Sequence, residues 1–248
     1  MVVTPNLARE KTPLVMTAGL SLISRSHTLR CDAKQAETRF AEFEAFISSV
    51  EHFCLGDFLP GPLLKGVQPN YIESLEPEGV PVISTIAIQQ LTIRKELCRY
   101  ISVDDFDAIG VERRPRKNDV LLTMDGGTSI GKPAVFDLEG EFAVDSHVAI
   151  LRPLGLDPRL LVYALACPLG QVQFQQAESG ASGQTAVTEE DVRRFRFPIL
   201  SQEDIEAIVS ALDSERAKVA QLAAQLREME GQAWLGFYRA MVSGAIPD

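Results

Sequence analysis

The chain has 248 residues, of which 46% are hydrophobic, enough to bury a core in one globular domain with an appendage. Its formal net charge of −10 at pH 7 argues against nucleic-acid binding driven by overall charge. Local basic clusters can nevertheless set a local potential. The apolar runs fall short of the roughly 18 to 20 residues that span a bilayer, so we expect no membrane segment.

The start of the chain and its cysteines favour a reducing cytoplasm. The first residues, MVVTPNLAREKTPLVM, lack the basic-then-apolar layout of a secretory signal. The four cysteines lie far apart without CxxC spacing, so the sequence predicts neither a disulfide framework nor a metal site. No cofactor is expected.

In chain order, the first clear element is an amphipathic helix over residues 32–50, with Phe40, Phe43, Ile47 and Val50 on one face. From Phe53 onwards, glycine and proline punctuate short apolar runs, which is typical of buried strands. The predicted strands cover residues 80–88, 119–124, 133–138, 142–144 and 148–151.

Helices are predicted after this strand-rich part. Asp157 followed by Pro158 is an N-cap with proline at the first helical position, and a second short helix is expected over residues 169–177. Within residues 180–212, a glycine-rich turn precedes two capping-box patterns that begin at Thr188 and Ser201. Between the two patterns, the alternation of apolar and basic residues over 195–199 predicts a half-buried strand.

After Ser201 the apolar residues repeat every seven positions, which predicts a coiled coil. The alternative is an ordinary amphipathic helix packed on its own domain, whose apolar stripe would drift by about 20° per heptad. Glu215 interrupts the second heptad position. The two apolar positions are occupied by Ile205, Leu212, Val219, Leu226 and Ala233, and by Ile208, Leu222 and Met229.

Together these elements predict an α+β fold, a mixed α/β domain followed by a long C-terminal coiled-coil helix. We expect three parts: an N-terminal segment over 1–52, a binding domain over 53–200 and a coiled-coil dimerisation or spacer helix over 201–248.

One glycine-rich stretch matches a motif of nucleotide-binding enzymes. Residues 126–132 fit the phosphate-binding pattern G-x-x-x-x-G-K. Pro133 stands where a magnesium-binding Ser or Thr belongs, and the following residues read as a strand, whereas a phosphate-binding loop opens a helix. We therefore expect a glycine hairpin tip that presents Thr128, Ser129 and Lys132.

No catalytic constellation stands out. The three histidines have no metal-ligand spacing, and the adjacency of Asp145, Ser146 and His147 says little, because triad members normally converge from distant parts of a chain. The sequence predicts a non-catalytic binding module.

The arrangement resembles the specificity subunits of type I restriction-modification systems over roughly residues 29–233. The matching stretches are K65-G-V-Q-P-N-Y71, G79-V-P-V-I-S84, N118-D-V-L-L-T123, I130-G-K132, S179-G-A-S-G-Q184 and F197-P-I-L-S-Q202 leading into the heptads.

The resemblance implies a non-catalytic subunit that recognises a DNA sequence, while a methyltransferase subunit and, in restricting complexes, a restriction subunit do the chemistry. It also implies a cytoplasmic protein of a bacterium or archaeon. Such subunits usually carry two recognition domains and two spacer helices. This sequence has one of each, so it looks like a half-subunit whose homodimer, with antiparallel coils, would read a palindromic bipartite site.

The candidate DNA-binding residues divide into two groups. Base reading is assigned to amide and hydroxyl side chains, namely Gln68, Asn70, Tyr71 and Gln89. Phosphate positioning is assigned to cations and small polar residues, namely Lys65, Arg113, Arg114, Lys117, Thr128, Lys132 and Ser182, with Gln184 in the same glycine-rich loop as Ser182. The dimerisation candidates are Ile205, Ile208, Leu212, Val219, Leu222, Leu226 and Met229. Two alternatives stay open, a protein-interaction adaptor that uses the coil and a nucleotide-binding enzyme that uses Gly126–Lys132.

Overall fold

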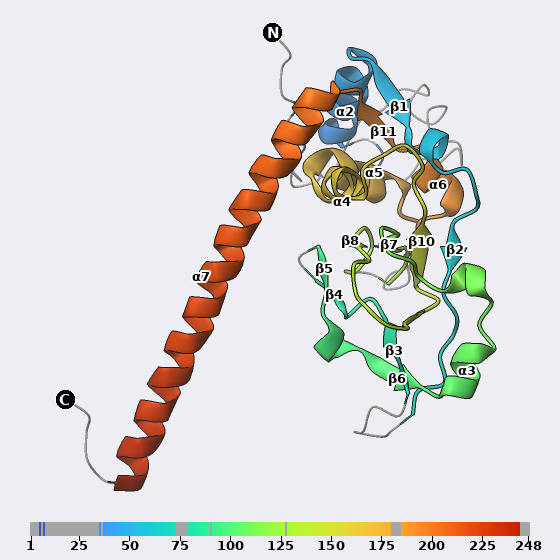
Figure 1. Cartoon of the computed structure of the whole chain (residues 1–248). Coiled ribbons are helices and arrows are strands. Elements are labelled where there is room, and N and C mark those ends of the chain that lie inside the picture. Colours follow the sequence, from blue (N-terminus) through green and yellow to red (C-terminus); the bar gives the residue numbers. More distant parts are fainter. Residues whose placement is uncertain are drawn as a thin grey trace. The chain divides into compact units, whose positions relative to one another are not determined.

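The computed structural model describes residues 5, 7, 35, 37–72, 79–89, 91–126, 128–179 and 185–243. The chain divides into two units, residues 1–199 and residues 200–248. Among the described residues, the first unit contains the sheets (Figure 1) and the second forms a long helix, which confirms the predicted α+β fold class. The glycine-rich residues 180–184, which hold Ser182 and Gln184, lie outside the described residues.

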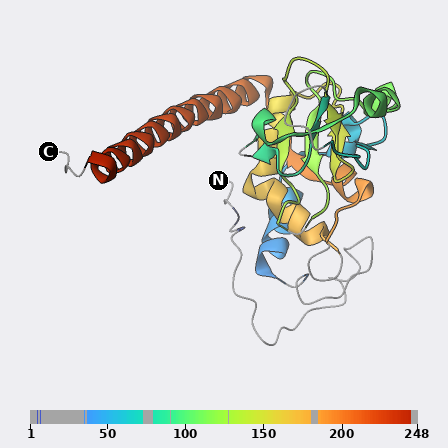
Figure 2. The same cartoon turned by 90° about the horizontal axis from the view of Figure 1, so that it is seen from below.

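Three helices gather at one end of the first unit, and most of the strands lie beyond them (Figures 1 and 2). They are α2 (Thr38–Ser48), α4 (Pro158–Ala166) and α5 (Pro168–Ala177). The predicted apolar face of α2 is confirmed, since Phe40, Phe43 and Ile47 are buried in a cluster with Val172 of α5.

Two of the predicted helix caps are confirmed. Asp157 accepts a hydrogen bond from the backbone N–H of Arg159 at the start of α4. Thr188 and Asp191 form a reciprocal capping box at the start of α6 (Glu189–Arg193), which satisfies backbone N–H groups that the first helical turn leaves unpaired.

A four-stranded antiparallel sheet lies at the centre of the unit, in the order β2-β10-β7-β8. Along β7, Val120 and Leu122 pack into one apolar cluster with residues of α4 and α5, while Leu121 packs into a second cluster on the other face. Both faces are buried, and this explains why the central strands read as continuous apolar runs. The strands are β2 (Leu64–Lys65), β7 (Val120–Thr123), β8 (Pro133–Val135) and β10 (Val148–Leu151).

Smaller sheets complete the unit. A three-stranded sheet has the order β6-β3-β9, in which β3 and β9 run parallel, and two pairs, β1-β11 and β4-β5, are antiparallel. These strands are β1 (His52–Cys54), β3 (Val80–Ile83), β4 (Ile88–Gln89), β5 (Thr92–Ile93), β6 (Arg99–Ile101), β9 (Ala143–Val144) and β11 (Arg196–Pro198).

Short helical turns link the strands, and one strand prediction needs correction. The turns are η2 (Leu55–Phe58), η3 (Lys95–Leu97), α3 (Val103–Asp107) and η4 (Val111–Arg113). The predicted strand over 80–88 is not continuous. It ends at Ile83, because a turn in which the Ala87 N–H donates to the Ser84 carbonyl separates β3 from β4.

The second unit is the 42-residue helix α7 (Gln202–Ser243), about 63 Å long at about 1.5 Å per residue. Its predicted N-cap is confirmed, since Ser201 Oγ accepts from the Asp204 N–H at 3.1 Å and donates to the Asp204 carboxylate at 2.6 Å. None of the described helices combines the length and apolar character that a membrane crossing requires.

Candidate nucleic-acid interface

The segment that follows β2 is held against the strand β9 by a close backbone approach that only glycine permits. A Cβ atom on Gly66 would lie 1.9 Å from the carbonyl oxygen of Val144. The Gly66 N–H donates to Val148 O at 3.1 Å, and the Val67 N–H donates to Val144 O at 2.9 Å. This contact determines the position of the backbone that carries Gln68, Asn70 and Tyr71.

The polar loop between β9 and β10 contacts two of the predicted DNA-binding residues directly, Gln68 and Tyr71. It is linked to a third, Lys65, through Asp125. Ser146 Oγ donates to the side-chain oxygen of Gln68 at 3.2 Å. The Tyr71 hydroxyl donates to Asp145 at 3.1 Å. His147 and Lys65 both contact the carboxylate of Asp125, Lys65 at 3.0 Å.

Asp145 and Ser146 therefore contact predicted binding residues directly, and His147 shares the Asp125 carboxylate with Lys65. In the sequence alone, the adjacency of these three residues gave little information. Their place between two buried strands is the signal that sequence reasoning missed. Polar residues confined to such a turn lie at one edge of a sheet, next to whatever strand pairs there.

Tyr71 is committed to an internal role. Burial, together with the nearby Asp145 carboxylate, raises the pKa of its hydroxyl to about 12, so the phenol keeps its proton and donates. The Arg99 guanidinium lies 3.7 Å from the centroid of the Tyr71 ring, a cation–π distance. The hydroxyl orients Asp145, which leaves less of its donor capacity for a base edge.

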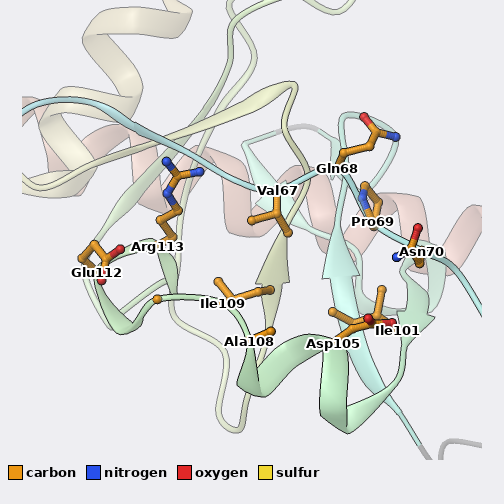
Figure 3. Close-up of a pocket in the computed structure, with 11 residues that line it drawn as sticks. Val67, Gln68, Pro69, Asn70, Ile101, Asp105, Ala108, Ile109, Glu112 and Arg113 are labelled. Atoms are coloured by element: carbon orange, nitrogen blue, oxygen red, sulfur yellow. The ribbon is translucent and has the colours of Figure 1, made fainter.

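A recess of about 340 Å³ opens beside this segment. Gln68 and Asn70 lie on one side of it and Arg113 of η4 lies on another (Figure 3). These three predicted residues come from distant parts of the chain, and only the fold brings them together. The remaining lining residues are Val67, Pro69, Ile101, Asp105, Ala108, Ile109, Gly110 and Glu112.

Arg152 holds the backbone around η4. Its guanidinium pairs with Asp119 at 3.1 Å, donates to the Glu112 carbonyl at 2.7 Å and donates to the Arg114 carbonyl at 2.9 Å. Asp119 also accepts from the Arg116 N–H at 2.7 Å. Burial raises the pKa of Asp119, against the opposing effect of these donors. The segment 112–116 is therefore clamped at both ends.

The three predicted basic residues of this segment have different environments. The Arg114 guanidinium donates to the carbonyls of Ile109 and Phe106 at 3.1 and 3.0 Å and lies 4.1 Å from the centroid of the Phe106 ring. Its donors are largely used inside the protein. Arg113 and Lys117 are exposed.

The turn at 126–132 joins two antiparallel strands, β7 and β8. The residues after Lys132 form a strand instead of the helix that a phosphate-binding loop opens. This geometry excludes the P-loop interpretation. Gly131 has φ +77°, and the Phe174 ring would lie 2.8 Å from a Cβ atom there, which explains the glycine. Thr128 and Lys132 are exposed on this turn.

Gln89 lies apart from this group, on the β4-β5 hairpin, where its side-chain amide donates to the Ile86 carbonyl at 3.1 Å. No group of three or more potential metal ligands occurs among the residues that the structure describes.

The predicted dimerisation residues form an exposed apolar stripe along α7. Ile205 is half-buried, and the others range from 40% exposed at Leu212 to 69% exposed at Met229. Solvent-exposed leucines at heptad spacing favour association with another helix.

Comparison with known proteins identifies the fold. Neither a protein-family model nor a curated protein sequence matches the chain. A structure described for complex assembly and conformational transition of the type I restriction-modification system matches at TM-score 0.50 and 20% identity, covering 86% of this chain and 52% of its own.

Two further structures match at TM-score 0.48. The S subunit of a type I restriction-modification system from M. genitalium is 16% identical over 70% of this chain and 41% of its own. The HsdS subunit from Thermoanaerobacter tengcongensis is 19% identical over 82% and 49%. The chain thus spans about half the length of the solved structures it matches.

Proposed function

We propose that this chain, which shares its fold with a protein of a type I restriction-modification system, is a DNA sequence-specificity subunit without catalytic activity of its own. It would select the target site and recruit a methyltransferase subunit, with a restriction subunit in complexes that cleave DNA. Double-stranded DNA is the ligand in this proposal, and no cofactor takes part.

The observation that carries the proposal is the gathering of Gln68, Asn70 and Arg113 around one recess. Amide and guanidinium groups are the side chains that read base edges in the major groove. They lie on a backbone held by Gly66 and by the Arg152 clamp, and such rigidity is what a sequence-reading surface needs. Lys117 and Lys132 are exposed on other turns of the same unit, where they would contact phosphates.

The exposed apolar stripe along α7 supports a homodimer. Two copies that pair their α7 seams in an antiparallel manner would present two recognition units related by a twofold axis. The target would then be a palindromic bipartite site whose spacing the coil determines. The seven apolar residues from Ile205 to Met229 supply the contact surface for this pairing.

The net charge of −10 limits how tightly the isolated chain can bind DNA, because affinity depends strongly on phosphate neutralisation. We therefore expect the methyltransferase subunit to supply much of the non-specific affinity, while this chain supplies the sequence preference.

Selection from randomised duplex DNA tests the proposal, with the chain alone and with a co-expressed methyltransferase subunit. The expected result is enrichment of one bipartite motif, strongest in the complex. Absence of an enriched motif in both conditions would instead favour the rival function, a protein-interaction adaptor that uses only the helix α7.

A further inference from the structure

The recess beside η4 combines groups of opposite charge over an apolar floor. Arg113 and Glu112 lie on one side of the recess and Asp105 lies on the opposite side, and the lining between them includes Ile109 and Ala108 (Figure 3). Among the described residues, no hydrogen bond or ion pair engages the side chains of Arg113 or Glu112. These charged groups are therefore available to a ligand.

This combination disfavours a phosphate as the ligand of Arg113. A phosphate group next to Arg113 would also lie near the carboxylate of Glu112, the preceding residue in the chain, and like charges repel. The edge of a base pair carries no net charge. It offers acceptors to a guanidinium and amino hydrogens to a carboxylate, so it satisfies both groups at once.

The local backbone places Arg113 and Glu112 as a unit. The Arg152 guanidinium binds the carbonyls on either side of Arg113, those of Glu112 and Arg114, at 2.7 and 2.9 Å. The Glu112 carboxylate occupies space that opens because residue 110 is glycine, since a Cβ atom on Gly110 would lie 2.3 Å from Glu112 Oε1. The two charged groups thus project from one clamped turn.

We propose that this recess reads one G·C base pair through the major groove. Arg113 donates two hydrogen bonds to O6 and N7 of guanine, and Glu112 accepts one from the N4 amino group of the paired cytosine. Gln68 and Asn70, on the other side of the recess, read the neighbouring pair through their amides. The assignment rests on the proposed DNA-recognition function, and it makes Arg113 a base reader instead of the phosphate contact that its sequence cluster indicated.

The test repeats the duplex selection on the full chain with its methyltransferase subunit, comparing wild type with Glu112→Gln and Arg113→Lys. Glu139→Gln is the matched control, because it makes the same chemical change at an exposed residue that does not line the recess. Circular dichroism and thermal unfolding establish that each variant is folded. Arg113→Lys keeps the charge but loses the bidentate fork.

Each recess variant is expected to relax the selected motif at the same G·C position and to weaken binding to the wild-type site by about 5- to 150-fold. The other motif positions and the Glu139→Gln motif should stay unchanged. An unaltered motif in both recess variants overturns the inference, as does uniform weakening on every sequence, which marks a phosphate contact. If wild type itself selects no motif, the proposed function fails first, so the two failures are distinguishable.

Discussion

The two units of the chain differ in how far their large apolar side chains are exposed. The first unit buries large side chains such as Phe40, Leu121 and Ile150 almost completely. The helix α7 leaves Val219, Leu222 and Met229 between 64% and 69% exposed. Exposing such a stripe is unfavourable by roughly 25 cal/mol per Å² of apolar surface. The first unit therefore has a buried core of its own, whereas α7 carries a surface that association would bury.

The largest expected effect of a single substitution breaks the first unit. Gly66→Ala would place a methyl group 1.9 Å from the Val144 carbonyl oxygen, and neither backbone can move away without losing strand pairing. We expect the free energy of unfolding to fall by on the order of 3 kcal/mol or more, measured by chemical denaturation. Gly61→Ala is the control, with no heavy atom within 4 Å, and should change stability by less than about 1 kcal/mol. Equal effects would contradict the close-approach argument.

The second prediction tests the proposed self-association of α7 and leaves the first unit unchanged. Leu222→Glu combined with Leu226→Glu puts charges on the apolar seam, and self-association should weaken by at least about 100-fold. Sedimentation at several concentrations measures the change. Ala217→Glu combined with Gln221→Glu adds the same charges at the same spacing, off the heptad seam, and should leave the dimer intact. A wild-type chain that stays monomeric at all concentrations would refute the dimer.

The third prediction concerns the clamp in the first unit. Arg152→Ala leaves Asp119, only 6% exposed in its side chain, without its cationic partner and removes the support of the 112–116 backbone. Because Arg152 itself is 28% exposed, solvent offsets part of the loss, and we expect about 2 to 3 kcal/mol of destabilisation. Thermal or chemical unfolding measures it. The control is Arg194→Ala, which breaks a surface pair with Glu190 and should lower the free energy of unfolding by less than about 1 kcal/mol. If Arg152→Ala lowers it by no more than this, the clamp is not needed for stability.

The smallest effect follows from Tyr71, whose pKa is raised from 10.0 to about 12 in the folded chain. A folded-state pKa above the unfolded value means that the protonated phenol stabilises the fold below pH 10 and that this contribution is lost as the pH rises towards 12. Tyr71→Phe should abolish this part of the pH dependence. In a pH titration followed by phenolate absorbance, the step near pH 12 should disappear. A variant that keeps the step near pH 12 would contradict the raised pKa of Tyr71.

Local sequence determined the elements that depend on neighbours in the chain. The Asp157 cap, the Thr188 capping box and the long helix after Ser201 were predictable because helix ends and helical apolar spacing are specified by residues a few positions apart. The buried strands over 120–123 and 148–151 were predictable because continuous apolar runs bounded by turns satisfy both faces of a covered sheet.

Only the tertiary structure decided the candidate site. Nothing in the sequence showed that Gly66 lies against Val144 or that the Arg114 guanidinium donates hydrogen bonds to backbone carbonyls of the same unit. Nor did it show that Gln68 and Arg113 line the same recess. Each of these facts is a contact between segments far apart in the chain. Such contacts follow from how sheets and turns pack, and the secondary-structure propensities of single segments do not predict them.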